Sequence, residues 1–240
     1  MSTQSVTVRS DLGTSSPHGN ASTRARVTAV AVALTLGSSL VISMLLWHPW
    51  PDRDDISYGA FAPIRDTAWL GLILDSIGYA TAGIALGVAV CLLVRERGAF
   101  TATMGAALVA LGGALFAAGS YSLGVLGWYA TATDAIPVAS GTSLMTYVDH
   151  NLAHVAAMEI AGFLMFNIGL LLLAVALRRS SSVPGWLPIA LGVLTVAQFV
   201  VPPTRALDIL QSVHMATFIA VAWFLRRTVD GRSPARATSA

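Results

Sequence analysis

Several ionisable side chains lie inside long apolar stretches of this sequence, where each one is costly unless a partner or a function keeps it there. Asp75, His154 and His214 fall at similar distances from the start of their own stretches, and His150 precedes His154 by one helical turn. Imidazole and carboxylate groups in such a set are typical ligands of zinc, and imidazole also carries protons near neutral pH. The sequence therefore predicts a site that binds a metal or protons.

Other polar side chains occur in the same stretches and are expected near this site. They are Tyr79, Asp149, Glu159, Asp208 and Gln211. A divalent metal such as zinc is favoured over haem, because His154 and His214 form the only histidine pair at one depth. His48 is interpreted as a loop residue at the membrane interface that needs no role.

Asp75 and Ser76 on one helix, with histidines on other helices, resemble the site of the seven-helix intramembrane zinc hydrolases of the ceramidase and progestin-receptor type. In that family, water on zinc attacks a lipid amide. The resemblance implies a metal-dependent hydrolase in which Asp75 or Glu159 is the general base. The number of predicted helices and the position of the His-xxx-His pair differ from that family, so the chain is not assigned to it.

The composition places these side chains in a membrane protein. Hydrophobic residues make up 55% of the 240 residues and charged residues only 11%, and the mean hydropathy is +0.70. A soluble domain carries about 25% charged residues. The single cysteine, Cys91, excludes an internal disulfide. The expected partner is the lipid bilayer, and the pI of about 9.0 is attributed to basic loops rather than to nucleic-acid binding.

Six apolar runs predict an all-α bundle of six transmembrane helices. The predicted spans are 27–47, 69–94, 102–126, 147–177, 186–201 and 207–225. All 14 basic residues are arginine. Eleven of them lie in the two terminal segments, in the loop between the second and third spans, and in the loop between the fourth and fifth; the others are Arg53, Arg65 and Arg205. Because arginine-rich loops stay in the cytoplasm, both termini are predicted to be cytoplasmic, in a multi-pass protein of the cell membrane.

The segments that flank these spans are rich in Ser, Thr and Arg. They predict disordered cytoplasmic tails over 1–26 and 228–240, around one transmembrane domain over 27–227. Within that domain, Gly83 and Gly87 in the second span and alanines at spacing four in the third predict close packing between these two helices.

Three functions remain open from the sequence. The first is a non-enzymatic membrane protein whose His/Asp site, in the outer half of the bundle, binds a metal or conducts protons or a small solute. The second is the metal-dependent intramembrane hydrolase. The third is a structural or accessory subunit in which the same side chains only hydrogen-bond one another. In each case, the side-chain tips of Asp75, His154 and His214 are expected within about 8 Å of one another.

Overall fold

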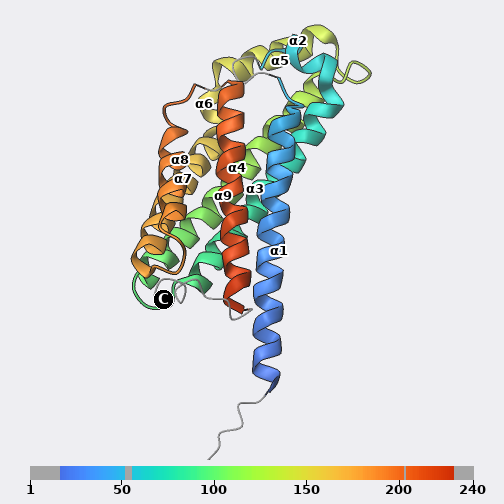
Figure 1. The fold of residues 1–240 in the computed structure, drawn as a ribbon. Helices are drawn as coiled ribbons and strands as arrows, with labels where there is room; N and C mark the ends of the chain where they lie inside the picture. Colours follow the sequence, from blue (N-terminus) through green and yellow to red (C-terminus); the bar gives the residue numbers. More distant parts are fainter. Residues whose placement is uncertain (1–16, 52–55, 203, 230–240) are drawn as a thin grey trace, which may run out of the picture.

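The computed structural model describes residues 17–51, 56–202 and 204–229, and every regular element among them is a helix. The main helices are α1 (Pro17–Trp47), α3 (Arg65–Leu93), α4 (Ala99–Ala130), α7 (Ala157–Ser180), α8 (Trp186–Ala197) and α9 (Arg205–Val229). Four short helices form a cap over one end of the bundle (Figure 1). They are α2 (Tyr58–Phe61), the 3-10 helix η1 (Ala62–Ile64), α5 (Val138–His150) and α6 (Leu152–Val155).

Five helical segments are long and apolar enough to cross a bilayer, so the prediction of an all-α membrane bundle is confirmed to that extent. They are Ala21–Trp47, Tyr58–Leu93, Ala99–Ala130, Ala157–Ser180 and Arg205–Thr228. Helix α8 is different, because its 12 residues extend only about 18 Å against a hydrocarbon core of about 30 Å. Where the sequence predicts a fifth span over 186–201, the chain passes toward the capped end partly as α8 and partly as residues 198–202, which follow it (Figure 1).

Helices α1, α3, α4, α7, α8 and α9 form a ring in which neighbours run antiparallel (Figure 1). Helix α1 packs on α3 and α9, α4 packs on α3 and α7, and α8 packs on α7 and α9. Helix α3 also contacts α9 across the ring. The end opposite the cap is called the arginine end here, and it carries Arg95, Arg97, Arg178, Arg179, Arg226 and Arg227.

Small residues allow α3 and α4 to approach closely, as the sequence predicts. A methyl group placed on Gly83 would lie 2.9 Å from the carbonyl oxygen of Val109. One placed on Gly87 would lie 3.0 Å from the Cα atom of Ala106. Gly83 and Gly87 therefore face α4, and the predicted pairing of these two helices is confirmed.

A second close contact, between α4 and α7, does not follow from the predicted pattern. It uses glycines spaced by seven residues, Gly105, Gly112 and Gly119 on α4 and Gly162 and Gly169 on α7. A methyl group on Gly112 would lie 2.8 Å from the carbonyl oxygen of Gly162, and one on Gly162 would lie 2.7 Å from that of Gly112. The two backbones are thus in direct contact, as small-residue interfaces in membranes permit.

The predicted fourth span is wrong at its start. Helix α5 ends at His150, α6 follows as a single turn, and α7 begins only at Ala157. Asn151 leaves the helical conformation, with φ −117° and ψ 24°, and its Nδ2 donates to the carbonyl oxygen of Tyr147 at 2.8 Å. Asparagine competes for backbone groups in this way, so the segment 147–155 folds into the cap instead of extending α7.

The N-terminal boundary also differs from its prediction. Helix α1 begins at Pro17, so residues 17–26, predicted to be disordered, are helical. Proline is favoured at the first helical position, and the stretch 21–26 contains no proline or glycine that would end the helix. The remaining predicted tail residues, 1–16 and 230–240, lie outside the described residues.

Candidate functional site

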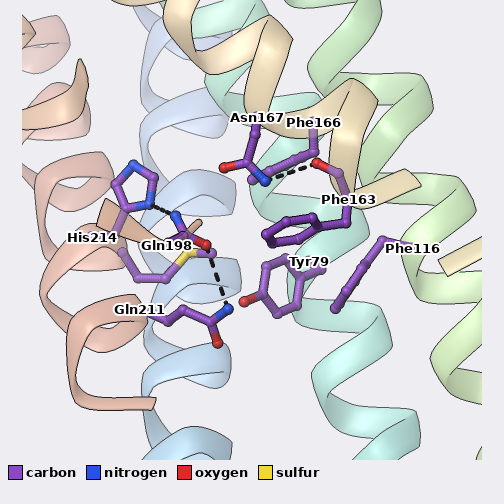
Figure 2. Close-up of a pocket in the computed structure, with 9 residues that line it drawn as sticks. Tyr79, Phe116, Phe163, Phe166, Asn167, Gln198, Gln211 and His214 are labelled. Carbon is purple, nitrogen blue, oxygen red and sulfur yellow. Dashed lines mark hydrogen bonds between the residues drawn. The ribbon is translucent and has the colours of Figure 1, made fainter. Parts of the chain in front are cut away.

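A chain of hydrogen-bonded side chains surrounds His214 inside the ring (Figure 2). Gln198 Nε2 donates to His214 Nδ1 at 2.6 Å, and Gln211 Nε2 donates to Gln198 Oε1 at 3.4 Å. The other ring nitrogen, His214 Nε2, lies 3.3 Å from Thr195 Oγ1, which donates to the carbonyl oxygen of Leu191 at 2.7 Å. These donor and acceptor roles fit a neutral imidazole that carries its proton on Nε2.

Helix α9 supplies Gln211 and His214 to this network, because its polar residues recur every three positions. Asp208, Gln211 and His214 therefore lie along one face of the helix. All three are buried, with exposed fractions of 2%, 2% and 1%. Gln198 directly follows the last residue of α8, so the early end of that helix brings its amide to the same level.

A small cavity separates this network from aromatic rings of α3, α4 and α7. The space open to the centre of a water molecule is about 10 Å³, enough for about one water. Asn167, 1% exposed, donates from Nδ2 to the carbonyl oxygen of Phe163 at 2.8 Å, and its Oδ1 has no hydrogen-bond partner among the described residues. Tyr79 packs on Phe116 at 4.6 Å between ring centroids and points its hydroxyl toward the Gln211 side of the cavity (Figure 2).

A larger cavity of about 470 Å³ lies nearer the cap and shares Phe116 and Phe163 with the small one. Its wall is mostly apolar, but Asp75 of α3, Ser120 of α4 and Glu159 of α7 also line it. Asp75 is 6% exposed. Glu159 is held close to α4, because a methyl group on the neighbouring Gly119 would lie 2.6 Å from the Cβ atom of Glu159. Two carboxyl groups from facing helices thus meet one apolar cavity.

This larger cavity opens sideways where α8 stops short. Ile160, Leu164 and Phe199 line it, and they are also 50%, 45% and 52% exposed on the outside of the ring. Phe199 follows α8 and packs against Phe163 at 5.4 Å between ring centroids. Apolar side chains therefore form both the wall of the cavity and its opening toward the surroundings of the bundle.

A third polar group lies between the capped ends of α1 and α9. His48 Nδ1 lies 2.9 Å from Asp208 Oδ2, and Arg205 Nη1 lies 3.6 Å from the same oxygen. The Arg205 guanidinium also donates to the carbonyl oxygens of Leu45 and Leu46 at 2.9 and 2.6 Å, in the last turn of α1. The interpretation that His48 needs no role is therefore wrong, because its imidazole pairs with a buried carboxyl group.

The predicted convergence of Asp75, His154 and His214 is not found. His214 belongs to the inner network and Asp75 to the larger cavity, whereas His154 is exposed on α6 in the cap. The break at Asn151 explains this result, because the predicted depth of His154 assumed one continuous helix. For the same reason, Glu159 lies in the first turn of α7 rather than deep within a continuous helix that begins at Tyr147.

The remaining predicted ligand, His150, and the predicted neighbour Asp149 also lie in the cap. His150 and Asp149 are exposed on α5, and a ring nitrogen of His150 contacts the carbonyl oxygen of Thr146 at 2.8 Å. Within the described residues, no group of three His, Cys, Asp or Glu side chains could hold a metal ion. The predicted zinc site therefore gains no support from the fold.

The structure does unite two subsets of the predicted residues. Tyr79, Gln211 and His214 line the small cavity, and Asp75 and Glu159 line the larger one. The sequence-based set omits Thr195 and Gln198 of the hydrogen-bonded network, and Asn167, which lines the small cavity. Their signal is present in the sequence, since each is a polar residue in an otherwise apolar helical stretch.

Comparisons with known proteins leave the chain without a family. No model of a protein family, no curated protein and no solved structure matches it. The two cavities and the side chains that line them are therefore the basis on which a function can be assigned.

Proposed function

We propose that this membrane protein binds a small amphipathic cation, an apolar molecule with a protonated amine, in the larger cavity. The proposal rests on Asp75 and Glu159, two carboxyl groups that line an otherwise apolar cavity of about 470 Å³. Ligand pockets are usually about 300–1,000 Å³, with apolar walls and a few polar groups that orient the ligand. An ammonium group beside these carboxyl groups would offset the cost of burying a carboxylate.

The sideways opening supports a ligand with a large apolar part. A molecule that reaches the cavity past Ile160, Leu164 and Phe199 meets only apolar side chains on its way. Its charged group then meets Asp75 and Glu159 on the inner wall. This order of contacts suits a molecule with a hydrophobic tail and one cationic end.

Solute binding is better supported than proton conduction through the whole bundle. Toward the arginine end, the inward-facing residues of α9 below His214 are Phe218, Val221 and Leu225, each 1% exposed or less. They form an apolar layer between the hydrogen-bonded network and the arginine end. We therefore assign that network to the packing of α8 against α9 at the floor of the binding cavity.

The first test is direct binding of decylamine, which is positively charged at neutral pH. Radiolabelled decylamine is expected to bind saturably to the purified protein in lipid nanodiscs. Asp75→Asn and Glu159→Gln should each weaken this binding about tenfold or more, because losing a charge contact inside a protein costs at least ~1.4 kcal/mol. Decanol, which has the same chain without the charge, should compete poorly.

Asp149→Asn is the matched control, because it removes a carboxyl group from the exposed face of α5 without touching the cavity. It should leave decylamine binding unchanged. The proposal fails if decylamine does not bind saturably, if Asp149→Asn weakens binding as much as Glu159→Gln, or if decanol competes as well as decylamine does. In those cases, the carboxyl groups serve the packing of the bundle.

We also propose that the chain crosses the cell membrane six times, with both termini in the cytoplasm. The support is the gathering of Arg95, Arg178 and Arg226 and their neighbours at the arginine end, together with the positive-inside rule. Reporters fused after Arg97, after Arg179 and at the C-terminus should therefore report the cytoplasm, and one inserted in 130–140 should report the outside. An external signal from the C-terminal fusion would mean an odd number of crossings and would refute this topology.

A further inference from the structure

A groove of about 680 Å³ runs along the outside of the ring between α7 and α8, away from both cavities described above. Its sides are apolar, with Leu171 and Val175 on α7 and Ile189 and Val193 on α8. At the arginine end of the groove stand Arg178 and Arg179, the last basic residues of α7. We infer that this groove binds one glycerophospholipid with an anionic headgroup, its phosphate on the two arginines and an acyl chain along the apolar sides.

The charges at the mouth of the groove are available to an external anion. Arg178 and Arg179 are both exposed, and neither forms a salt bridge with a carboxyl group among the described residues. The guanidinium of Arg178 also lies close to the connection to α8, because a methyl group on Gly185 would lie 2.9 Å from its Nη1 atom. Adjacent guanidinium groups fit the oxygens of a phosphate diester through paired hydrogen bonds.

The depth of the groove comes from small residues between the two helices. A methyl group on Gly192 would meet only the Cβ atom of Ala174, at 3.9 Å. The open space there continues from the arginines toward the middle of the bundle, as an acyl chain does below its headgroup. Trp186, 56% exposed at the start of α8, is of the residue type enriched where headgroups meet the hydrocarbon core. The two arginines, the depth of the groove and the position of Trp186 therefore favour a lipid over a soluble anion.

The test compares two lipids that share their acyl chains, dioleoyl phosphatidylglycerol and dioleoyl phosphatidylcholine. The full-length protein is purified in detergent with each lipid added, and bound lipid is counted by native mass spectrometry. One phosphatidylglycerol should remain bound at concentrations at which phosphatidylcholine does not. The double variant Arg178→Gln/Arg179→Gln should weaken its retention roughly tenfold or more, as expected for two basic groups at an anionic headgroup. Gly192→Leu, which fills the groove without altering charge, should weaken it as well.

Arg226→Gln/Arg227→Gln removes the same charge from the end of α9 and is the matched control, expected to retain the lipid. Equal retention of the two lipids, or an equal loss in the α7 and α9 double variants, would overturn the inference, because only the general charge of the arginine end would then matter. A dimer that Gly192→Leu separates, with lipid retention unchanged, would show that a second copy of the chain occupies the groove. If Gly192→Leu lowers the unfolding temperature, the α7 double variant still decides the outcome.

Discussion

Gly162→Leu is expected to prevent the bundle from assembling. A methyl group at this position would already lie 2.7 Å from the carbonyl oxygen of Gly112 on α4, and an isobutyl group needs far more room. The obstacle is backbone rather than a flexible side chain, so α4 and α7 would have to separate along their length. Overpacking in a core costs about 1–3 kcal/mol when side chains can move. Here the loss should exceed ~3 kcal/mol, since the glycines at 105, 119 and 169 would lose their contacts too.

Folded yield in the membrane and the unfolding temperature in detergent are the measurements for this variant. Gly192→Leu is the control, because it places the same side chain on α8, where only the Cβ atom of Ala174 lies within reach, at 3.9 Å. That variant should fold, since leucine is also a better helix former than glycine. If Gly162→Leu folds as well as Gly192→Leu does, α4 and α7 are not in backbone contact at this position.

Asp208→Ala is expected to lower the free energy of unfolding by about 2–3 kcal/mol. Asp208 is 2% exposed and joins the ends of two helices, through His48 at 2.9 Å and through Arg205 at 3.6 Å. Removing the carboxyl group leaves the imidazole without this partner and frees the guanidinium that also binds the end of α1. We expect a smaller loss of unfolding free energy than for a fully buried ion pair, because the Arg205 side chain is 52% exposed.

Asp134→Ala serves as the comparison, because Asp134 also faces an arginine. Its carboxyl group lies 3.9 Å from Arg65 Nη1, but its side chain is 82% exposed. Such a pair contributes little in water, so the free energy of unfolding should change by less than ~0.5 kcal/mol. Equilibrium unfolding in mixed detergent micelles measures both variants. Equal effects would mean that Asp208 does not tie α1 to α9.

Most of the long helices were predictable from the sequence, because membrane helices are recognised by their length and hydropathy. The second predicted span, 69–94, corresponds to Arg65–Leu93, and the third, 102–126, to Ala99–Ala130. The fourth failed at Asn151, where one side-chain hydrogen bond to Tyr147 ends a stretch whose composition is otherwise helical. Hydropathy reflects the preference of side chains for apolar surroundings, and it does not detect such a local competition for backbone groups.

The site was less predictable, because it depends on which helices become neighbours. Tyr79 and Gln211 were expected near His214, and all three line the small cavity. Counting depth along the helices misplaced His154, because the predicted fourth span is broken at Asn151. It also offered no way to place Glu159 at the cavity that Asp75 lines, which Glu159 reaches because glycines let α7 lie against α4. The order of helices around the ring was therefore the missing information.

The short helix α8 has a consequence for how the proposed ligand would reach this protein. With Leu164 and Phe199 exposed at the opening, such a ligand would first dissolve in the bilayer and only then meet the cavity. Each methylene group favours that first step by about 0.8 kcal/mol, or about fourfold in concentration. Two ligands with identical contacts to Asp75 and Glu159 would then occupy the cavity at very different aqueous concentrations. If the larger cavity binds the proposed amphipathic cation, the membrane would act as a reservoir that enriches hydrophobic ligands before the carboxyl groups select among them by charge.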